Sequence, residues 1–483
     1  MQLVVRNARL RGRSGTYDIG VESGRIRKLS HSLNEKGEEE VDARGGIVLP
    51  PFIDMHFHLD SALSYGDPRF NESGTLLEGI EIWGEKKRKI TVDEIRERAS
   101  RMLKLMVIHG TQFLRTNADV TEPGLKPLKA LLRVKREFKD LIDLQVTAFP
   151  QDGIMTDPEN RELLEKSVEE GADNVGMIPH HEFTREDGVA SVHFAFELAK
   201  KYDRDIDGHV DETDDEQSRF LEVVAAEAIR GKYEGRVTAG HATAMHSYND
   251  AYAAKLYRIL KRAGVTIIAN PLINITLQGR FETYPKRRGM ARVKELLEHG
   301  VNVALGHDCV MDPWYPLGKG DMLQPLFMAV HVGQLTGREE LADSFDLITR
   351  NPAKALRIEE RYGIEEGKSA SMVVLEAKSE SEALARLAPP LFVIRAGDVI
   401  VRRTPSVTEL IGPGEKEKLD VSELLGGRVL GSEGLPRQFS PPPTVNDDFG
   451  EVRHLRNTSR KSWFRRTAIP RTWPRRVETA SST

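Results

Sequence analysis

The sequence predicts a (β/α)8 barrel joined to a small β-sandwich domain, and three observations predict this fold. Eight short apolar runs alternate with amphipathic segments over about 290 residues, close to the size of a typical barrel of this kind. Strand-like segments without intervening helices lie before and after that series. The first apolar run leads into a His-x-His and the last into an Asp, as expected where a barrel gathers ligands that lie far apart in sequence.

The small β domain is predicted from both ends of the core chain. Residues 1–46 alternate apolar and polar side chains, with glycine-containing turns between the runs. The same pattern returns in residues 369–403. We therefore expect residues 1–46 and 352–411 to form one β-sandwich, into which the barrel of residues 47–351 is inserted.

The barrel strands are predicted at 47–53, 111–116, 143–149, 174–178, 205–208, 236–240, 265–269 and 301–306. Helices are predicted between them at 125–138, 161–170, 190–202, 216–230, 251–263 and 293–299, with one more at 322–335. Another helix opens at Thr91-Val92-Asp93-Glu94, a capping-box pattern. A doubly wound sheet is the rival fold, but it needs a Gly-rich phosphate loop where this chain has His56-Phe57-His58.

The last segment, residues 412–483, loses this periodicity and becomes basic. It contains three consecutive prolines at 441–443 and many arginines, with Trp463 and Trp473 among them. We expect a disordered basic tail, because such a composition buries little apolar surface. An arm for nucleic acid or another acidic partner is the alternative, since aromatic residues are interleaved with the arginines.

Composition excludes several classes of protein. Cys309 is the only cysteine, so the chain forms no internal disulfide and no cysteine-rich zinc site, and a reducing, cytoplasmic location is expected. The formal net charge of −4 gives no global field for nucleic acid or membranes. No apolar run approaches the roughly 18 residues of a membrane span, and the start of the chain reads as a strand and not as a signal peptide.

Residues of metal-ligand type gather at the ends of the predicted strands. His56 and His58 are two apart on a strand, so both imidazoles point to the same side. A lone His-x-His would be weak evidence, but His209, His241 and Asp308 follow the fifth, sixth and eighth strands. Because strand ends meet at one mouth of a barrel and bare charges are costly to bury, this set predicts a catalytic metal site.

Other polar residues near the strand ends are interpreted as supporting groups. His180, His181 and His307 are expected to be loop or packing residues, and His246 to support a loop. Glu182 and Asp214 are expected to orient their neighbours.

Several long motifs carry a family resemblance over most of residues 1–405. They are Pro51-Phe52-Ile53-Asp54-Met55-His56-Phe57-His58, Ser73-Gly74-Thr75-Leu76-Leu77-Glu78-Gly79, Ala148-Phe149-Pro150-Gln151, His209-Val210-Asp211-Glu212-Thr213-Asp214-Asp215-Glu216, His241-Ala242-Thr243-Ala244-Met245-His246, Tyr284-Pro285-Lys286-Arg287-Arg288-Gly289 and Asp312-Pro313-Trp314-Tyr315-Pro316. The chain resembles the amidohydrolase superfamily and, within it, the bacterial cytosine deaminases. The tail after residue 412 is not covered.

The resemblance implies one Fe²⁺ or Zn²⁺ ion per chain, bound by His56, His58, His209 and Asp308, that lowers the pKa of a bound water. It also implies proton transfer by Asp308, which would accept the water proton, and by Glu212, which would carry a proton to the ring nitrogen and the leaving ammonia. His241 would hydrogen-bond the tetrahedral centre.

The same resemblance implies the residues that contact the substrate. Gln151 would pair with the amide-like edge of the ring, because its carboxamide offers one donor and one acceptor group. Leu76, Phe149 and Trp314 would form apolar walls. The expected partners are a small heterocyclic base and further copies of the chain in a homo-oligomer.

Cys309 departs from the family pattern. Cytosine deaminases usually carry a second Asp directly after the metal-binding one, at the far edge of the ring. A thiol there makes the spot less polar and roomier, so we hypothesise that 5-methylcytosine is accepted as well as or better than cytosine. The alternative is that Cys309 only tunes packing and cytosine is the substrate; a role as nucleophile is not expected.

Other functions stay open at this level. Within the superfamily, the chain could act on an s-triazine, creatinine or isoguanine. A non-heme iron oxygenase with two His and a carboxylate is a rival from another class. A binding protein on a catalytically dead barrel is the third alternative.

Overall fold

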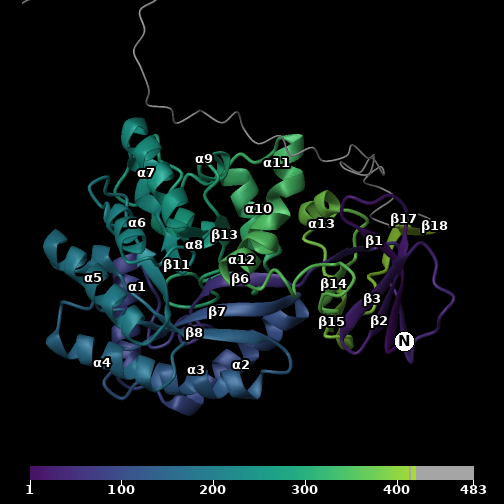
Figure 1. The fold of residues 1–483 in the computed structure, drawn as a ribbon, viewed down its shortest axis with the longest axis horizontal. Helices are drawn as coiled ribbons and strands as arrows, with labels where there is room; N and C mark the ends of the chain where they lie inside the picture. The colour runs from purple at the N-terminus through teal and green to yellow at the C-terminus, as the bar shows by residue number, and fades with distance from the viewer. Residues whose placement is uncertain (413–414, 420–483) are drawn as a thin grey trace, which may run out of the picture. The chain divides into compact units, whose positions relative to one another are not determined.

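The computed structural model describes residues 1–412 and 415–419, and its central element is a barrel of eight parallel strands (Figure 1). In order around the sheet, these are β6 (Phe52–Phe57), β7 (Thr111–Asp119), β8 (Asp143–Phe149), β9 (Asn174–Val175), β10 (Asp205–Val210), β11 (Val237–His241), β12 (Thr266–Ala269) and β13 (Val303–Leu305). The strand order follows the chain order, which confirms the predicted (β/α)8 barrel.

The barrel closes between β6 and the residues that follow β13. Phe57 forms a parallel bridge with Asp308. The backbone N–H of Asp308 donates to the carbonyl of His56 over 2.9 Å, and the N–H of His58 donates to the carbonyl of Asp308 over 3.0 Å. This closure brings the first and last predicted ligands together.

Amphipathic helices surround the strands, and their apolar faces form one core with the barrel. The helices are α1 (Leu76–Lys87), α2 (Val92–Ile108), α3 (Lys126–Glu137), α4 (Pro158–Glu169), α5 (Arg185–Lys201), α6 (Phe220–Arg230), α7 (Asp250–Ala263), α8 (Pro271–Leu277), α9 (Val293–Glu298), α10 (Leu323–Val332), α11 (Arg338–Asp343) and α12 (Arg350–Ala355). The predicted start of a helix at Thr91 is confirmed at α2, where the Thr91 hydroxyl accepts from the N–H of Glu94 over 3.2 Å. The other half of the predicted capping box is not formed, because the Glu94 carboxylate accepts from Lys86 over 2.8 Å.

The chain passes from the small domain to the barrel at Pro50-Pro51. The single strand predicted at 47–53 is two strands: β5 (Ile47–Leu49) pairs with the small sheet, and β6 begins at Phe52. Proline has no N–H to donate to a ladder, so the pair interrupts the strand at this point. Residues 47–49 therefore lie in the small sheet.

The small sheet is built from both ends of the core chain, as the sequence predicts. Its strand path is β16 (Asp398–Arg402), β15 (Pro390–Arg395), β14 (Met372–Leu375), β5, β1 (Leu3–Leu10), β2 (Tyr17–Glu22) and β3 (Arg25–Ser30), with β4 (Glu39–Asp42) paired to β1. Apolar side chains from β1 to β5 and from β14 and β15 share one buried core. A short helix, α13 (Glu380–Arg386), lies between β14 and β15.

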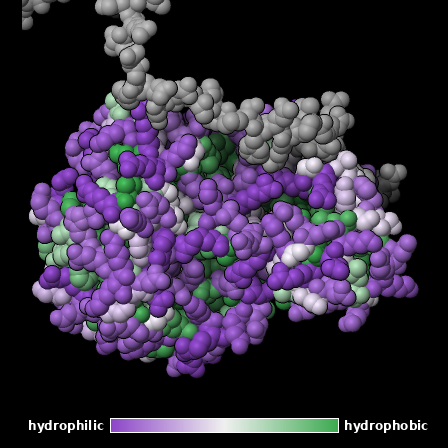
Figure 2. Space-filling view, viewed as in Figure 1, coloured by the Kyte–Doolittle hydropathy of each residue, from purple (hydrophilic) through white to green (hydrophobic). Residues whose placement is uncertain are grey.

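A two-stranded hairpin follows, formed by β17 (Thr408–Gly412) and β18 (Glu415–Leu419). The rest of the predicted basic tail lies outside the described residues. The described helices include none with both the length and the apolar character that a membrane span requires. Charged and polar residues cover much of the face seen in the space-filling view, with apolar groups scattered among them (Figure 2).

Candidate active site

Three histidines and one aspartate converge at the carboxyl ends of the barrel strands. His56 lies near the end of β6, His58 follows it, His209 lies on β10 and Asp308 follows β13. The Nε2 atoms of His58 and His209 are 3.0 Å apart, and Nε2 of His58 lies 3.6 Å from Oδ1 of Asp308. Nε2 of His56 lies 3.9 Å from Oδ2 of Asp308. The structure thus brings all four predicted ligands together.

Backbone geometry directs these side chains into the mouth. Asp308 has a φ of 71°, and His241 at the end of β11 has a φ of 69°. Residues other than glycine rarely adopt such left-handed conformations, and they are frequent at functional sites. Gly306 makes the close approach of β13 possible, because a Cβ there would lie 2.6 Å from the Cβ of His56.

The four residues fit a divalent metal ion. Both ring nitrogens of His56, Nδ1 of His209 and Oδ2 of Asp308 are buried without a hydrogen-bond partner among the described residues. Orphaned buried polar atoms are costly unless something binds them. Ligand atoms about 2.0–2.2 Å from one ion lie roughly 3 to 3.6 Å apart, which is close to the observed spacing.

Burial also keeps the three histidines of the ligand group in the neutral form that metal binding requires. It lowers the pKa of His56 to about 3 and lowers the pKa of His58 and His209 well below the usual value. Neutral imidazoles are the form that binds metals. Burial raises the pKa of Asp308, so a nearby positive charge is needed to keep this carboxyl ionised.

Glu212 and His241 lie beside the ligand group. Oε1 of Glu212 is 3.2 Å from Nδ1 of His241, which is 3.8 Å from Oδ2 of Asp308. Burial, and then the charge of Asp308, raise the pKa of Glu212 well above its usual value. The Asn274 amide lies 2.9 Å from Nδ1 of His241 and holds the ring in place.

The loop that carries Glu212 is anchored by its neighbour. Asp211 has a φ of 56°, which turns the chain sharply after β10. Its buried carboxylate accepts the N–H groups of Phe220 and Leu221 over 3.0 and 2.9 Å, at the start of α6. Glu212 is therefore held on a fixed turn.

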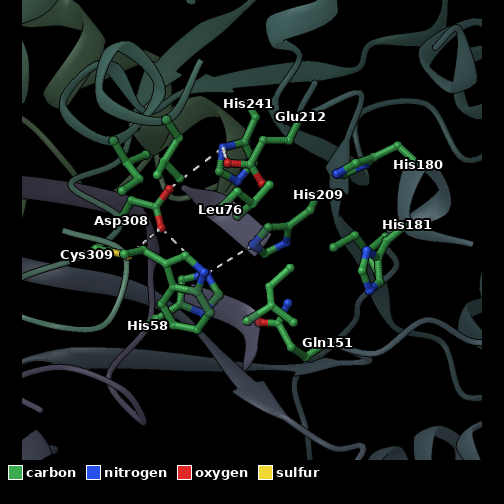
Figure 3. A pocket seen from close by; sticks show the side chains of 15 residues that line it. His58, Leu76, Gln151, His180, His181, His209, Glu212, His241, Asp308 and Cys309 are labelled. Atoms are coloured by element: carbon green, nitrogen blue, oxygen red, sulfur yellow. Dashed lines mark hydrogen bonds and ion pairs between the residues drawn. The ribbon is translucent and has the colours of Figure 1, made fainter. Parts of the chain in front are cut away.

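A cavity opens beside these groups (Figure 3). Four of the residues predicted to contact a substrate line it: Gln151, Leu76, Cys309 and Trp314. Phe149 does not: it is buried behind the cavity, where its ring stacks on His209 with centroids 3.9 Å apart. Phe149 therefore packs against a predicted metal ligand and does not line this cavity.

A sequence model of the amidohydrolase family matches residues 39–402 of this chain. The chain belongs to the amidohydrolase family. Membership of this family makes it a hydrolase and removes the support for an oxygenase or a non-catalytic barrel.

Three relatives illustrate the range of this amidohydrolase's neighbours. The chain is 32% identical to N-isopropylammelide isopropyl amidohydrolase of Pseudomonas sp. (strain ADP), over 83% of this chain and 97% of the relative. It is 30% identical to pterin deaminase of Rhizobium rhizogenes (strain K84 / ATCC BAA-868), over 81% of this chain and 90% of the relative. Among solved structures, it is 44% identical to 5-methylcytosine deaminase from Klebsiella pneumoniae with bound 5-fluorocytosine, covering 83% and 98% of the two chains with a TM-score of 0.81.

Several residues of the amidohydrolase cavity were not predicted to line it. His180 and His181 were interpreted as supporting groups, yet both line the cavity. Four apolar residues also line it: Ile80, Ile178, Ile273 and Leu277. The histidines were visible near a strand end, whereas nothing in the sequence separated the four apolar residues from the core.

The remaining supporting residues hold loops, as expected. Asp214 accepts the backbone N–H of Gly279 over 2.8 Å and lies 2.9 Å from Nε2 of His246. His307 is buried, with its ring nitrogens near the Cys309 carbonyl and the Gln324 side chain.

Proposed function

We propose that this amidohydrolase hydrolytically deaminates an amino-pyrimidine, converting 5-methylcytosine or cytosine into thymine or uracil and releasing ammonia. The observation that carries the proposal is the cavity lined by three of the predicted metal ligands, His58, His209 and Asp308, together with Glu212 and Gln151. The 44% sequence identity to a 5-methylcytosine deaminase supports an amino-pyrimidine as the substrate.

A bound Fe²⁺ or Zn²⁺ ion would lower the pKa of a coordinated water and so supply hydroxide near neutral pH. Asp308 accepts the proton released from the water, because its carboxylate lies within the ligand group. His241 hydrogen-bonds the oxygen that becomes negatively charged as the tetrahedral centre forms.

Glu212 transfers the proton to the substrate. Its raised pKa keeps a proton available near neutral pH, and its position beside His241 places that proton next to the reacting carbon. It protonates the ring nitrogen adjacent to that carbon, which makes the carbon electrophilic. The ionised Glu212 then takes the proton of the hydroxyl group on the tetrahedral carbon and passes it to the amino group, so that the C–N bond breaks, ammonia leaves and the carbonyl forms. The proton held by Asp308 returns Glu212 to its protonated form.

Gln151 holds the other end of the ring. Its carboxamide donates one hydrogen bond to the 2-carbonyl oxygen and accepts one from the adjacent ring N–H. Leu76 and Trp314 cover the faces of the ring. This arrangement keeps the reacting carbon over the ligand group.

Cys309 accounts for acceptance of a 5-methyl group. Its thiol is buried, burial raises its pKa well above the usual value, and its sulfur donates to Oδ1 of Asp308 over 3.4 Å. The thiol is therefore neutral and presents an apolar surface to the ring, where a carboxylate would attract water.

The decisive test is ammonia release from a panel of bases with Fe²⁺ and Zn²⁺ supplied separately. We expect turnover of cytosine and 5-methylcytosine, with kcat/KM for the methylated base equal or higher. The Cys309→Asp variant should shift the preference towards cytosine. Strong rejection of 5-methylcytosine by the unmodified enzyme would overturn the role given to Cys309.

The second candidate is removal of an amino or alkylamino group from another heterocycle. The relatives that act on N-isopropylammelide and on pterin favour it. Including isoguanine, creatinine and an alkylamino s-triazine in the same panel distinguishes the two. We also propose that the enzyme works as a homo-oligomer, which light scattering on the full chain measures directly.

A further inference from the structure

Two histidines that the proposed chemistry does not use line one wall of the cavity. His180 and His181 lie on a short 3-10 helix, η1 (Pro179–His181), which follows β9. Figure 3 shows them on the side opposite Asp308 and Cys309, between Glu212 and Gln151, with the His180 ring pointing into the cavity.

This wall is anchored to the loop of Gln151. Glu182, which directly follows η1, accepts the backbone N–H groups of Ile154 and Met155 over 2.7 and 3.0 Å. Gly153 packs against the same carboxylate, since a Cβ there would lie 2.8 Å from Oε2 of Glu182. The histidine turn and the Gln151 loop are therefore held as one unit.

His180 offers a hydrogen-bond donor to the cavity. Its Nδ1 is buried and has no hydrogen-bond partner among the described residues. Burial lowers the pKa of His180 to about 3, so the ring is neutral and carries one N–H. A buried N–H without a partner is rarer than a buried acceptor without one, so the proton belongs on Nε2.

The orientation of the ring then decides what His180 meets. Glu212 and Cys309 both line the cavity. In the proposed pose, with the reacting carbon at the ligand group, the ring nitrogen would face Glu212 and the 5-position would face Cys309. Proceeding around the ring from Glu212 towards Gln151, the next group is the 2-carbonyl oxygen. In this pose the oxygen would face the wall between Glu212 and Gln151, where Figure 3 shows His180.

We propose that Nε2–H of His180 donates a second hydrogen bond to the 2-carbonyl oxygen of the bound pyrimidine, beside the one from Gln151. His180 is then a specificity-determining residue that selects rings with a strong acceptor at position 2. This inference rests on the proposed deamination of amino-pyrimidines.

The test compares cytosine with 2-thiocytosine, whose sulfur is a weaker hydrogen-bond acceptor, in the unmodified enzyme and in three variants. His180→Leu removes the donor, His180→Gln keeps an N–H donor, and His193→Leu is a matched control at an exposed histidine on α5. His180→Leu should lower kcat/KM for cytosine about fivefold to tenfold and weaken inhibition by the product uracil by a similar factor. It should lower kcat/KM for 2-thiocytosine much less. Metal content and thermal unfolding should match the unmodified enzyme in all three.

His180→Gln should retain most of the discrimination between the two bases, and His193→Leu all of it. An equal loss on both bases, or no loss in His180→Leu, would overturn the assignment. If the unmodified enzyme releases no ammonia from any pyrimidine, the proposed function itself fails, and the two failures are therefore distinguishable.

Discussion

Gly79 is the position where one methyl group should disturb the substrate cavity most clearly. It lies on the buried side of α1, and a Cβ there would lie 2.3 Å from Cδ1 and 2.5 Å from Nε1 of Trp314. Ordinary contacts begin near 3.4 Å, so the indole must retreat by more than 1 Å. Trp314 lines the cavity, so this movement changes the space for the ring.

The same helix contains a matched control. Gly84 has nothing within 4 Å of a built Cβ, so Gly84→Ala should gain only the helix propensity of alanine, about 0.5–1 kcal/mol. Gly79→Ala gains the same term but also overpacks a buried contact, which costs about 1–3 kcal/mol. The free energy of unfolding should therefore be about 1–3 kcal/mol lower for Gly79→Ala than for Gly84→Ala.

Chemical denaturation of both variants measures this difference, and steady-state kinetics measures its effect on the cavity. We expect kcat/KM on the preferred base to fall about tenfold in Gly79→Ala, a loss of roughly 1.4 kcal/mol of transition-state binding, and to stay unchanged in Gly84→Ala. Equal stability and equal kinetics in the two variants would refute the reasoning that Gly79 exists to seat Trp314.

Three further outcomes are expected. Glu212→Gln should keep its metal, measured by elemental analysis, yet lose about 10²–10⁴-fold in kcat, and near-normal ammonia release would remove Glu212 from its proton-transfer role. His209→Ala, or a chelator applied to the unmodified enzyme, should abolish metal binding and lower the unfolding temperature, because the metal ion binds and stabilises only the folded state. An unchanged melting curve would argue against a metal at this site. Lys87→Met should lower the free energy of unfolding, measured by chemical denaturation, by about 3 kcal/mol. The reason is that the buried carboxylate of Asp119, which lies 3.0 Å from the Lys87 ammonium, would lose its cation. A loss under about 0.5 kcal/mol would contradict this.

The barrel was predictable because its pattern is local and repeated. Each strand is a short apolar run, and each helix has a regular apolar face, so both appear in the sequence without knowledge of the neighbours. The boundary between β5 and β6 at Pro50-Pro51 was not predicted. The residues on both sides of the two prolines are apolar, so the whole segment was interpreted as one strand. Pairing partners in the small sheet decided that Ile47 to Leu49 lie there.

The ligand group was predictable for a related reason. Strand ends of a parallel barrel meet at one mouth, so His56, His58, His209 and Asp308 become neighbours once the strands are counted. The walls of the cavity do not follow from that rule. Phe149 and Gln151 are two residues apart, yet a turn in which the N–H of Gln151 donates to the carbonyl of Phe149 over 3.0 Å separates their directions, and only Gln151 lines the cavity.

The amino-acid sequence by itself determined the fold and the kind of chemistry, because residue type and strand order are enough to gather His and Asp ligands beside an acid. Only the tertiary structure decided which side chains surround the ring. In the structure Phe149 stacks on His209 and does not line the cavity, whereas His180 lines the wall between Glu212 and Gln151. Their places depend on packing and on loop turns between segments far apart in the chain, which no local pattern encodes.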